Sequence, residues 1–372
     1  MGLRNIIRAC RFVKRIVFTK KPRIGYVGGY QGHRNLGDEA LYAALRRLFS
    51  SGNFIDYNRG LLPNRIVRSL PKCDLMLMGG GTIVGGQKES SYRWAKTCFT
   101  LAPHGIVFGS GVVSPEFTTA VLRQPAEIQK QQQWADIIKK CDYIGVRGPL
   151  SRAILEGWGI HNVEIIGDPV LNISQSKMPD AYSINNNLIG FNVGQAEGSV
   201  WGNEAHICEQ FIKLAQVAGK AGFRIKWFVV WPKDLPVTKQ VVRDSGVSAD
   251  ICEIYEDYEK YMDIVSRANI FVGMKLHAAA LATCAYVPSV MLEYNPKCRD
   301  YMDSIGQGEF ALRTDTFTAQ QAWKKIEKLL ANRSSVAKSL FEAVSKFRKL
   351  QSMRASEISA NLGLKQISNR RG

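Results

Sequence analysis

The sequence predicts an α/β protein made of two doubly wound domains that face a shared cleft. Short apolar runs of strand length alternate with amphipathic segments of helix length along most of the chain, which is typical of parallel sheets with helical crossovers. The chain has 372 residues, about two domains' worth, and 45% of them are hydrophobic. A polar, turn-rich segment at 174–187 interrupts the alternation, so we place a linker there.

Each domain is expected to contain a Rossmann-like sheet, the first within residues 24–173 and the second within residues 188–332. The carboxyl ends of both sets of strands then border the cleft, where ligands bind. Strands are predicted at 24–28, 54–57, 74–78, 106–109, 143–147 and 163–166, and at 188–193, 223–231, 251–254, 270–273 and 289–293. Helices are predicted at 38–49, 126–140, 204–218, 258–267, 278–286 and 318–331.

The N-terminal segment, residues 1–23, is basic and contains no acidic residue. A helix there would place Arg4, Arg8, Arg11 and Arg15 on one face, with apolar residues between them. Two interpretations remain open. The segment either lies as an amphipathic helix on an anionic membrane surface, or it is an arm whose apolar residues pack on the protein body.

The C-terminal segment, residues 333–372, is also basic and rich in helix-forming residues. Leu340, Val344, Phe347 and Leu350 follow helical spacing and predict a buried stripe. We therefore expect this helix to have a mainly structural role.

Composition limits the cellular setting and the kinds of site. The eight cysteines include no C-x-x-C pair and several lie in apolar runs, which is typical of reduced thiols in a cytosolic protein and of neither a disulfide framework nor a zinc site. No apolar stretch is long enough to span a bilayer, and the N-terminus lacks the apolar core of a signal peptide. The net charge of +18 indicates an acidic partner, such as nucleic acid, anionic lipid or a phosphorylated substrate.

The loop between the first predicted strand and helix is rich in glycine and ends in two carboxylates, Asp38 and Glu39. Carboxylates at a helix N-terminus repel phosphate, so this loop suits neutral hydroxyl groups better than pyrophosphate. His33 and Asn35 add hydrogen-bonding groups suited to a sugar. The alternative is that Asp38 only caps the helix.

Three further features follow predicted strands of the first domain. Gly79, Gly80 and Gly81 leave room either for a ligand or for close packing between domains. Arg147 is expected to face the cleft and to clamp a carboxylate or phosphate, with a surface salt bridge as the alternative. Asp168 is expected to hold Arg147 or a substrate hydroxyl, or simply to form a turn.

The second domain carries a cluster of cationic side chains. Lys275 and His277 lie where a strand passes into an alanine-rich helix, and Lys297 lies at the start of the next helix. A helix N-terminus with such side chains is suited to an anion. A bound anion would raise the pKa of His277 and favour a proton donor near neutral pH. The alternatives are a packing or capping histidine and a solvated lysine.

Taken in order, these segments resemble the polysaccharide pyruvyl transferase family. The matching motifs are N-x-G-D-E-A-L (35–41), G-G-G (79–81), V-R-G-P-L-S-R (146–152), G-D-P (167–169), K-L-H-A (275–278) and Y-N-P-K (294–297).

This resemblance implies a glycosyltransferase B-like fold and transfer of a pyruvyl group from phosphoenolpyruvate, without a metal or cofactor, to a glycan made for the cell envelope. It implies that Arg147, Lys275 and Lys297 contact the donor, with His277 as the catalytic residue. The family commonly has Arg where this chain has Lys275, so a bidentate clamp is replaced by a point charge. A glycan acceptor that is lipid-linked would fit a position at the inner face of the cytoplasmic membrane.

Two other functions are compatible with parts of the sequence. A nucleotide-sugar glycosyltransferase of the same fold would need a ribose-binding carboxylate, for which Glu293 is the candidate. A nucleic-acid-binding or membrane-binding scaffold would explain the net charge, but no base-reading helix, aromatic strand motif or zinc module is present. We therefore expect no nucleic-acid partner.

Overall fold

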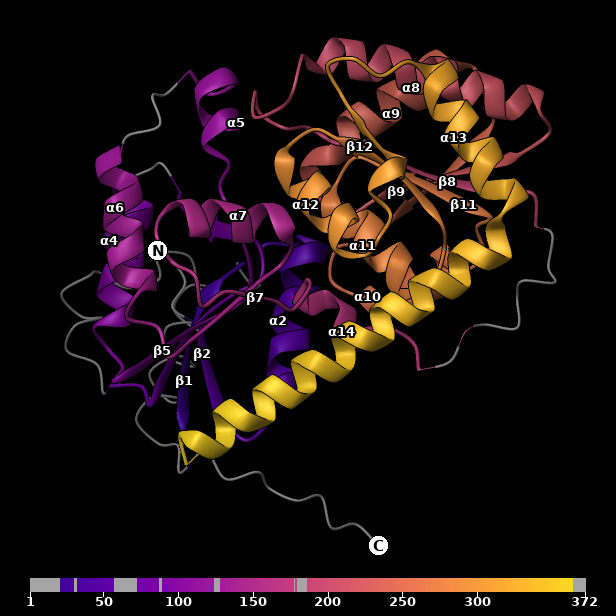
Figure 1. The fold of residues 1–372 in the computed structure, drawn as a ribbon. Coiled ribbons are helices and arrows are strands. Elements are labelled where there is room, and N and C mark those ends of the chain that lie inside the picture. The colour runs from indigo at the N-terminus through magenta and orange to yellow at the C-terminus, as the bar shows by residue number, and fades with distance from the viewer. Residues whose placement is uncertain are drawn as a thin grey trace, which may run out of the picture.

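A computed structural model describes residues 21–29, 32–56, 72–86, 89–123, 128–176, 178 and 186–363. Within them the chain forms two parallel sheets, which lie in two lobes (Figure 1). The first sheet consists of β1 (Arg23–Gly28), β2 (Asn53–Asp56), β3 (Leu75–Gly79), β4 (Thr82–Val84), β5 (His104–Val112), β6 (Tyr143–Val146) and β7 (Glu164–Ile165). The second sheet consists of β8 (Leu188–Asn192), β9 (Arg224–Val229), β10 (Ala249–Glu253), β11 (Ile270–Gly273), β12 (Ser289–Glu293) and β13 (Ala311–Arg313).

The strand order explains where a ligand site belongs. The first sheet has the order β2-β1-β3-β5-β6-β7, with β4 beside β5, and the second has the order β10-β9-β8-β11-β12-β13. The direction of winding therefore reverses between β1 and β3 in one sheet and between β8 and β11 in the other. Loops that follow strands at such reversals form the usual ligand sites of doubly wound sheets. The loops after β1, β3 and β11 carry several of the predicted site residues, and Arg147, Asp168 and Lys297 follow β6, β7 and β12.

The helices connect these parallel strands. Every strand and helix whose range was predicted is present, and its predicted ends lie within three residues of the observed ends. Tyr57 and residues 126–127, at the ends of two predicted elements, lie outside the described ranges. The elements β4, β13, α4, α5 and α9 were not predicted, and of these β4, β13 and α5 have too few residues to show a periodicity. The helices are α2 (Leu36–Leu48), α4 (Glu89–Phe99), α5 (Pro115–Ala120), α6 (Ile128–Ile138), α7 (Pro149–Gly157), α8 (Glu204–Lys220), α9 (Leu235–Ser245), α10 (Tyr258–Val265), α11 (Leu276–Cys284), α12 (Pro296–Ser304), α13 (Ala319–Ala331) and α14 (Arg333–Asn361). Short 3-10 turns lie at η1 (Pro169–Ile173), η3 (Pro232–Asp234) and η4 (Gly308–Phe310).

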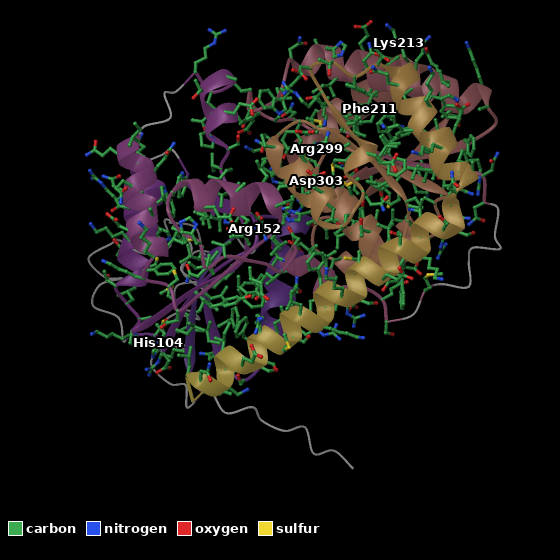
Figure 2. The ribbon with its side chains drawn as sticks, in the orientation of Figure 1. His104, Arg152, Phe211, Lys213, Arg299 and Asp303 are labelled. Carbon is green, nitrogen blue, oxygen red and sulfur yellow. The ribbon has the colours of Figure 1, made fainter. Side chains whose placement is uncertain are left out.

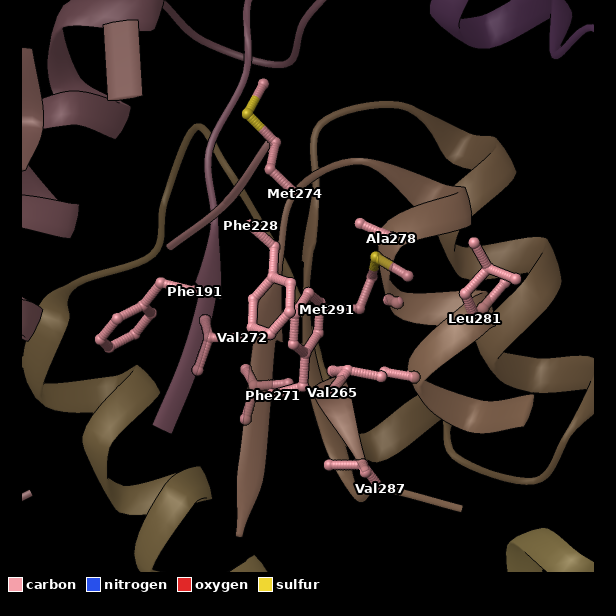
Figure 3. Packing of buried hydrophobic residues seen from close by; sticks show 14 of the residues in the cluster. Phe191, Phe228, Val265, Phe271, Val272, Met274, Ala278, Leu281, Val287 and Met291 are labelled. Atoms are coloured by element: carbon pink, nitrogen blue, oxygen red, sulfur yellow. The ribbon is translucent and has the colours of Figure 1, made fainter. Parts of the chain in front are cut away.

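The largest hydrophobic core joins the two domains. Leu36, Ala40 and Leu41 of α2, a first-domain helix, belong to the same buried cluster as Phe228 and Phe271 of the second sheet. Figure 3 shows the second-domain side of this cluster, where phenylalanine side chains pack beside aliphatic ones. Because one helix contributes to the core of the other domain, the two domains share buried apolar area.

The long C-terminal helix α14 spans both lobes (Figure 1, yellow). Its first half packs on the core shared with the second domain, whereas Ala355 and Ile358 belong to the core of the first domain. The predicted structural role is therefore supported by the packing. The predicted stripe consists of buried Leu340, Val344 and Phe347 and the partly buried Leu350.

Polar contacts fix α14 against the turn that follows β7. The buried Gln351 side-chain amide donates hydrogen bonds to the carbonyls of Ile166 (2.9 Å) and Asp168 (3.0 Å). Phe347 lies against Gly167, where an added Cβ would be 2.8 Å from its ring. Gly167 also has a φ of 77°, which favours glycine. The helix therefore holds the backbone on either side of Asp168.

Several predicted segments are only partly described. Residues 1–20, residues 364–372 and, within the predicted linker, residues 177 and 179–185 lie outside the described ranges. None of the helices in the described residues combines the length and apolar character needed to cross a membrane.

Replacing Phe347 with alanine should lower the free energy of unfolding by about 3–5 kcal/mol, because the substitution leaves a cavity between α14 and the Gly167 turn. Urea denaturation followed by circular dichroism measures this loss. Met353, on the same helix but 46% exposed, is the matched control. Met353→Ala should change stability by less than about 0.5 kcal/mol. Equal effects of the two substitutions would contradict this packing.

Candidate active site

Arg147 follows β6 and is completely buried. Its guanidinium lies 3.4 Å (Nε) from Asp300 Oδ2 and 3.9 Å (Nη1) from Asp168 Oδ2. Nη2 donates a hydrogen bond of 3.0 Å to the Thr82 hydroxyl. The expectation of a clamp facing an open cleft is wrong, and so is the alternative of a surface salt bridge, because the partner carboxylates are buried with the guanidinium. Asp168 does hold Arg147, and it also forms the predicted turn by accepting a hydrogen bond from the Val170 N–H (3.0 Å).

Asp300 joins the two domains and was not predicted from the sequence. This residue of α12 accepts hydrogen bonds from the Ser151 N–H (3.0 Å) and hydroxyl (2.6 Å) at the start of α7. Gly148 allows the approach, because an added Cβ would lie 2.1 Å from the Asp300 carbonyl oxygen. Figure 2 shows the region where α7, which carries Arg152, faces α12, which carries Asp303. The partners are 149 residues apart, so no local pattern could have revealed the contact.

His277 lies in the first turn of α11, between the two domains. Its Nε2 is 3.8 Å from Asp168 Oδ2, and the side chain is 18% exposed. Its Nδ1 packs against Gly37 of α2, where an added Cβ would lie only 2.2 Å away. A backbone hydrogen bond also joins the two domains here, in which the Leu36 N–H donates to the Val230 carbonyl (3.0 Å). The histidine therefore contacts the glycine-rich loop region that was predicted to bind the acceptor.

The environment of His277 favours its neutral form. Burial, and the positive charges of Lys297 and Arg147, lower its pKa to about 3. The predicted proton donor near neutral pH depends on a bound anion, so it stays a prediction, and without ligand the ring is neutral at that pH. A bound anion would oppose the part of the shift that comes from charge, because it would compensate the two nearby cations.

Lys297, in the first turn of α12, is a cation without a close carboxylate. Among the described residues its Nζ makes no ion pair or hydrogen bond, and it lies 4.8 Å from the centre of the Tyr294 ring. Burial lowers the pKa of Lys297 and the charge of Arg147 lowers it further, whereas Cys298 and the carboxylate of Asp38 oppose the shift. The alternative of a solvated surface lysine is therefore wrong, and positive charge is concentrated beside His277.

Lys275 is bound within its own domain. Its Nζ lies 3.3 Å from Asp234 Oδ1 and donates a hydrogen bond to the Gln195 carbonyl. The ammonium group also lies 5.3 Å from the centre of the Trp231 ring. Asp234 is buried, and desolvation raises its pKa while Lys275 opposes the shift. Lys275 is thus partly neutralised, and Lys297 is the better placed of the two lysines to meet an anion.

The first-domain loop contributes side chains of different kinds. Asn35, and not Asp38, caps α2, because its side-chain oxygen accepts from the Gly37 N–H (3.2 Å). Asp38 packs on Gly29, where an added Cβ would be 2.4 Å from its carboxylate. The Glu39 carboxylate accepts a hydrogen bond from the Gly32 N–H and so closes the loop. His33 is exposed.

The three glycines after β3 mainly allow close packing. An added Cβ at Gly79 would lie 2.6 Å from Leu45 of α2, and one at Gly80 would lie 2.7 Å from Leu41. Gly80 and Gly81 both have a φ of 65°, and the Gly81 carbonyl accepts a long hydrogen bond (3.5 Å) from Arg147. These contacts lie within the first domain, so they support neither the predicted packing between domains nor the predicted ligand site.

Two other kinds of site were considered. Glu293, the predicted ribose-binding candidate, is buried and is held by the Arg299 side chain at 3.0 Å. In the described ranges, no three side chains of His, Cys, Asp or Glu converge as metal ligands would. The groups that do converge are Arg147, Asp168, His277, Lys297 and the Gly37–Asp38 end of α2.

Replacing Gly37 with alanine should lower the free energy of unfolding by about 1–3 kcal/mol, because the new methyl group would overlap the His277 imidazole. Gly37→Ala/His277→Ala should recover part of that loss, since the ring is gone although its Cβ, 2.7 Å from the added methyl group, remains. Gly157→Ala in α7 is the control, because nothing lies within 4 Å of its added Cβ. Chemical denaturation of the unmodified protein, the two single site variants, the double variant and the control tests the contact, and additive effects of the two site substitutions would contradict it.

Three solved structures with the same overall fold hold UDP, UDP-GlcNAc or both. S. aureus MnaA solved with UDP aligns with a TM-score of 0.58 and 12% identity, covering 93% of this chain and 98% of that one. UDP-GlcNAc 2-epimerase from Neisseria meningitidis, bound to UDP-GlcNAc, gives a TM-score of 0.52 and 12% identity over 92% and 100%. The enzyme of the same name from Methanocaldococcus jannaschii, in complex with UDP-GlcNAc and UDP, gives 0.53 and 11% over 83% and 92%. At this identity the likeness confirms the glycosyltransferase B-like fold and nothing about the ligand.

A comparison with curated proteins found no match. The family comparison is decisive because it covers most of the chain and both sheets. A model described as polysaccharide pyruvyl transferase matches residues 35–296, a stretch that begins at the Asn35 cap of α2 and ends at the start of α12. The chain therefore belongs to the polysaccharide pyruvyl transferase family.

Proposed function

We propose that this protein transfers the pyruvyl group of phosphoenolpyruvate to two hydroxyls of one sugar, forming a pyruvate ketal and releasing phosphate. The observation that carries the proposal is the juxtaposition of His277 and Lys297 with the N-terminal end of α2. Burial lowers the pKa of both groups, and nearby positive charge lowers each pKa further. An anionic ligand would be stabilised at such a site.

The donor has the charges that this site would stabilise. Phosphoenolpyruvate carries a carboxylate and a phosphate, and Lys297 and the first turn of α11 offer an ammonium group and backbone N–H groups to them. Arg147 contributes its charge from a buried position, where it is paired with Asp168 and Asp300. Lys275 supports the loop at Gln195 and contributes at longer range.

The acceptor would bind on the first-domain side, near Asn35, Asp38 and the exposed His33. Asp38 is the carboxylate of this loop whose charge acts on Lys297. It is therefore suited to orient the diol or to accept a proton from it. Glu39 is engaged with the Gly32 backbone, so its contribution would be to hold the loop in place.

The proposed chemistry begins when the bound donor anion raises the pKa of His277 and the ring becomes protonated. His277 then delivers a proton to the terminal CH2 carbon of the enol, and C2 becomes oxocarbenium-like while Lys297 and Arg147 stabilise the anionic groups. A sugar hydroxyl attacks C2 and loses its proton to a base. Phosphate leaves with the electrons of its C–O bond, and the second hydroxyl attacks C2 and loses its proton to close the ketal.

Transfer from a nucleotide sugar is less well supported than pyruvyl transfer. The carboxylate that would bind a ribose diol, Glu293, is already held by Arg299 at 3.0 Å. Thermal shift measurements with phosphoenolpyruvate and with a panel of nucleotide sugars would separate these functions. Stabilisation by a nucleotide sugar alone would favour the glycosyltransferase.

His277→Ala should reduce phosphate release from phosphoenolpyruvate by about 10²–10⁴-fold, because the proposed general acid is lost. The assay couples phosphate detection with mass spectrometry of candidate glycans, in which a pyruvyl ketal adds a defined mass. His104→Ala is the control, since His104 lies at the start of β5, at the amino ends of the parallel strands, whereas the site lies at their carboxyl ends. Nearly unchanged turnover by a folded His277→Ala variant would remove the central claim.

We further propose that the acceptor is lipid-linked and that the basic residues of 1–23 bring the enzyme to an anionic membrane. Deleting residues 1–20 should abolish sedimentation with liposomes rich in anionic lipid, because the attraction of the basic side chains is lost. Activity on a soluble acceptor should persist. Neutral liposomes serve as the control, and unchanged partitioning of the truncated protein would contradict the proposal.

A further inference from the structure

Two buried polar atoms face each other in the site without a hydrogen bond. Within the described part of the chain, Asp168 Oδ2 and His277 Nε2 have no hydrogen-bond partner, and they are 3.8 Å apart. That distance is too long for a hydrogen bond. Catalytic hydrogen bonds are often long before ligand binds and tighten in the complex.

We propose that Asp168 is a positioning residue, whose Oδ2 accepts the Nε2–H of His277 and leaves Nδ1 as the nitrogen turned toward the acceptor loop at Gly37. The other oxygen of Asp168 is already occupied by the Val170 N–H (3.0 Å). Oδ2 is therefore the oxygen available to the histidine. The ring orientation does not depend on the reaction, whereas its effect on pyruvyl transfer rests on the proposed function.

The surroundings of Asp168 suit a positioning role. The Asp168 side chain is completely buried and its backbone carbonyl accepts a hydrogen bond from Gln351 of α14 (3.0 Å). Gly37 blocks the imidazole on its other side, because even an added Cβ would be 2.2 Å from Nδ1. The ring is thus held between a fixed carboxylate in one direction and the backbone of α2 in the other.

The fixed carboxylate would determine which nitrogen of the neutral ring carries the proton. With Asp168 ionised, the proton belongs on Nε2, and the lone pair of Nδ1 is turned toward α2 at Gly37. When the donor binds and the ring takes up a second proton, that proton enters on Nδ1. The charged form is then stabilised by Asp168, as in Ser-His-Asp hydrolases.

The tautomer of His277 should change when the pH falls, because Asp168 becomes protonated. Burial raises the pKa of Asp168 to about 6, although Arg147 opposes the shift, while the His277 ring stays neutral in this range. Asp300 faces Asp168 as well, and the thiol of Cys284 and the hydroxyl of Tyr301 lie close enough to feel its charge. Below about pH 6, protonated Oδ2 would donate to Nε2, so the ring proton would shift to Nδ1.

Nitrogen-15 NMR of histidine side chains tests this inference without any substrate. The chain contains five histidines, and His277→Gln identifies the signal. We expect the Nε2–H tautomer at pH 7.5 and a change to Nδ1–H by pH 5 in the unmodified protein. In Asp168→Asn, the Val170 N–H still occupies the side-chain oxygen, so the amide NH2 should donate to Nε2 and fix the Nδ1–H tautomer at both pH values.

Asp300→Asn is the matched control, because Asp300 is also a buried carboxylate beside Arg147 but has no contact with His277 among those found in the described residues. It should keep the Nε2–H tautomer at pH 7.5. An Nδ1–H tautomer in the unmodified protein at pH 7.5, or an unchanged tautomer in folded Asp168→Asn, would overturn the proposal. If Asp168→Asn does not fold, the pH-dependent change in the unmodified protein decides, and its absence overturns the proposal.

Activity then separates this inference from the proposed function. Asp168→Asn should lower kcat for pyruvyl transfer by about 10²-fold or more through the wrong tautomer, with a smaller change in KM for phosphoenolpyruvate. The expected tautomers together with no transfer to any acceptor would contradict the proposed function alone. Unchanged kcat in Asp168→Asn, in an otherwise active enzyme, would overturn the positioning role.

Discussion

The insertion of α2 into the core of the second domain is the constraint on which the rest of the structure depends. Leu36, Ala40 and Leu41 are buried among second-domain side chains. This packing fixes the position of α2, and so the place where Gly37 contacts His277. The buried Asp300 adds a polar tie between α12 and α7. Site residues from both domains are therefore positioned by packing that is already complete without a ligand, which reduces the ordering cost of binding.

The two domains present side chains of opposite charge to the site. The second domain presents cations at the ends of β11 and β12, whereas the first domain presents the carboxylates of α2. Only part of the positive charge is neutralised within the protein, since Lys275 has Asp234 but Lys297 has no such partner among the described residues. An anionic donor and a neutral acceptor would each meet the side of the site suited to it.

The sequence predicted the architecture well and the site unevenly. Strand and helix positions follow from apolar periodicity, which is a local property, and the same holds for the buried stripe of α14. Exposure was misjudged at Arg147 because burial depends on Asp300, a partner from the other domain. The low pKa of His277 without ligand could not be predicted for the same reason: the sequence shows that cations are nearby in the chain, but not that Lys297 and Arg147 lie near a largely buried ring.

The path of α14 has a consequence for how the protein as a whole loses structure. One continuous helix contributes Leu340 and Val344 to one core and Ala355 and Ile358 to the other, while Gln351 between them binds the turn at Asp168. Fraying of this helix would expose apolar surface in both lobes together. The packing of α14 therefore couples the stability of the two halves.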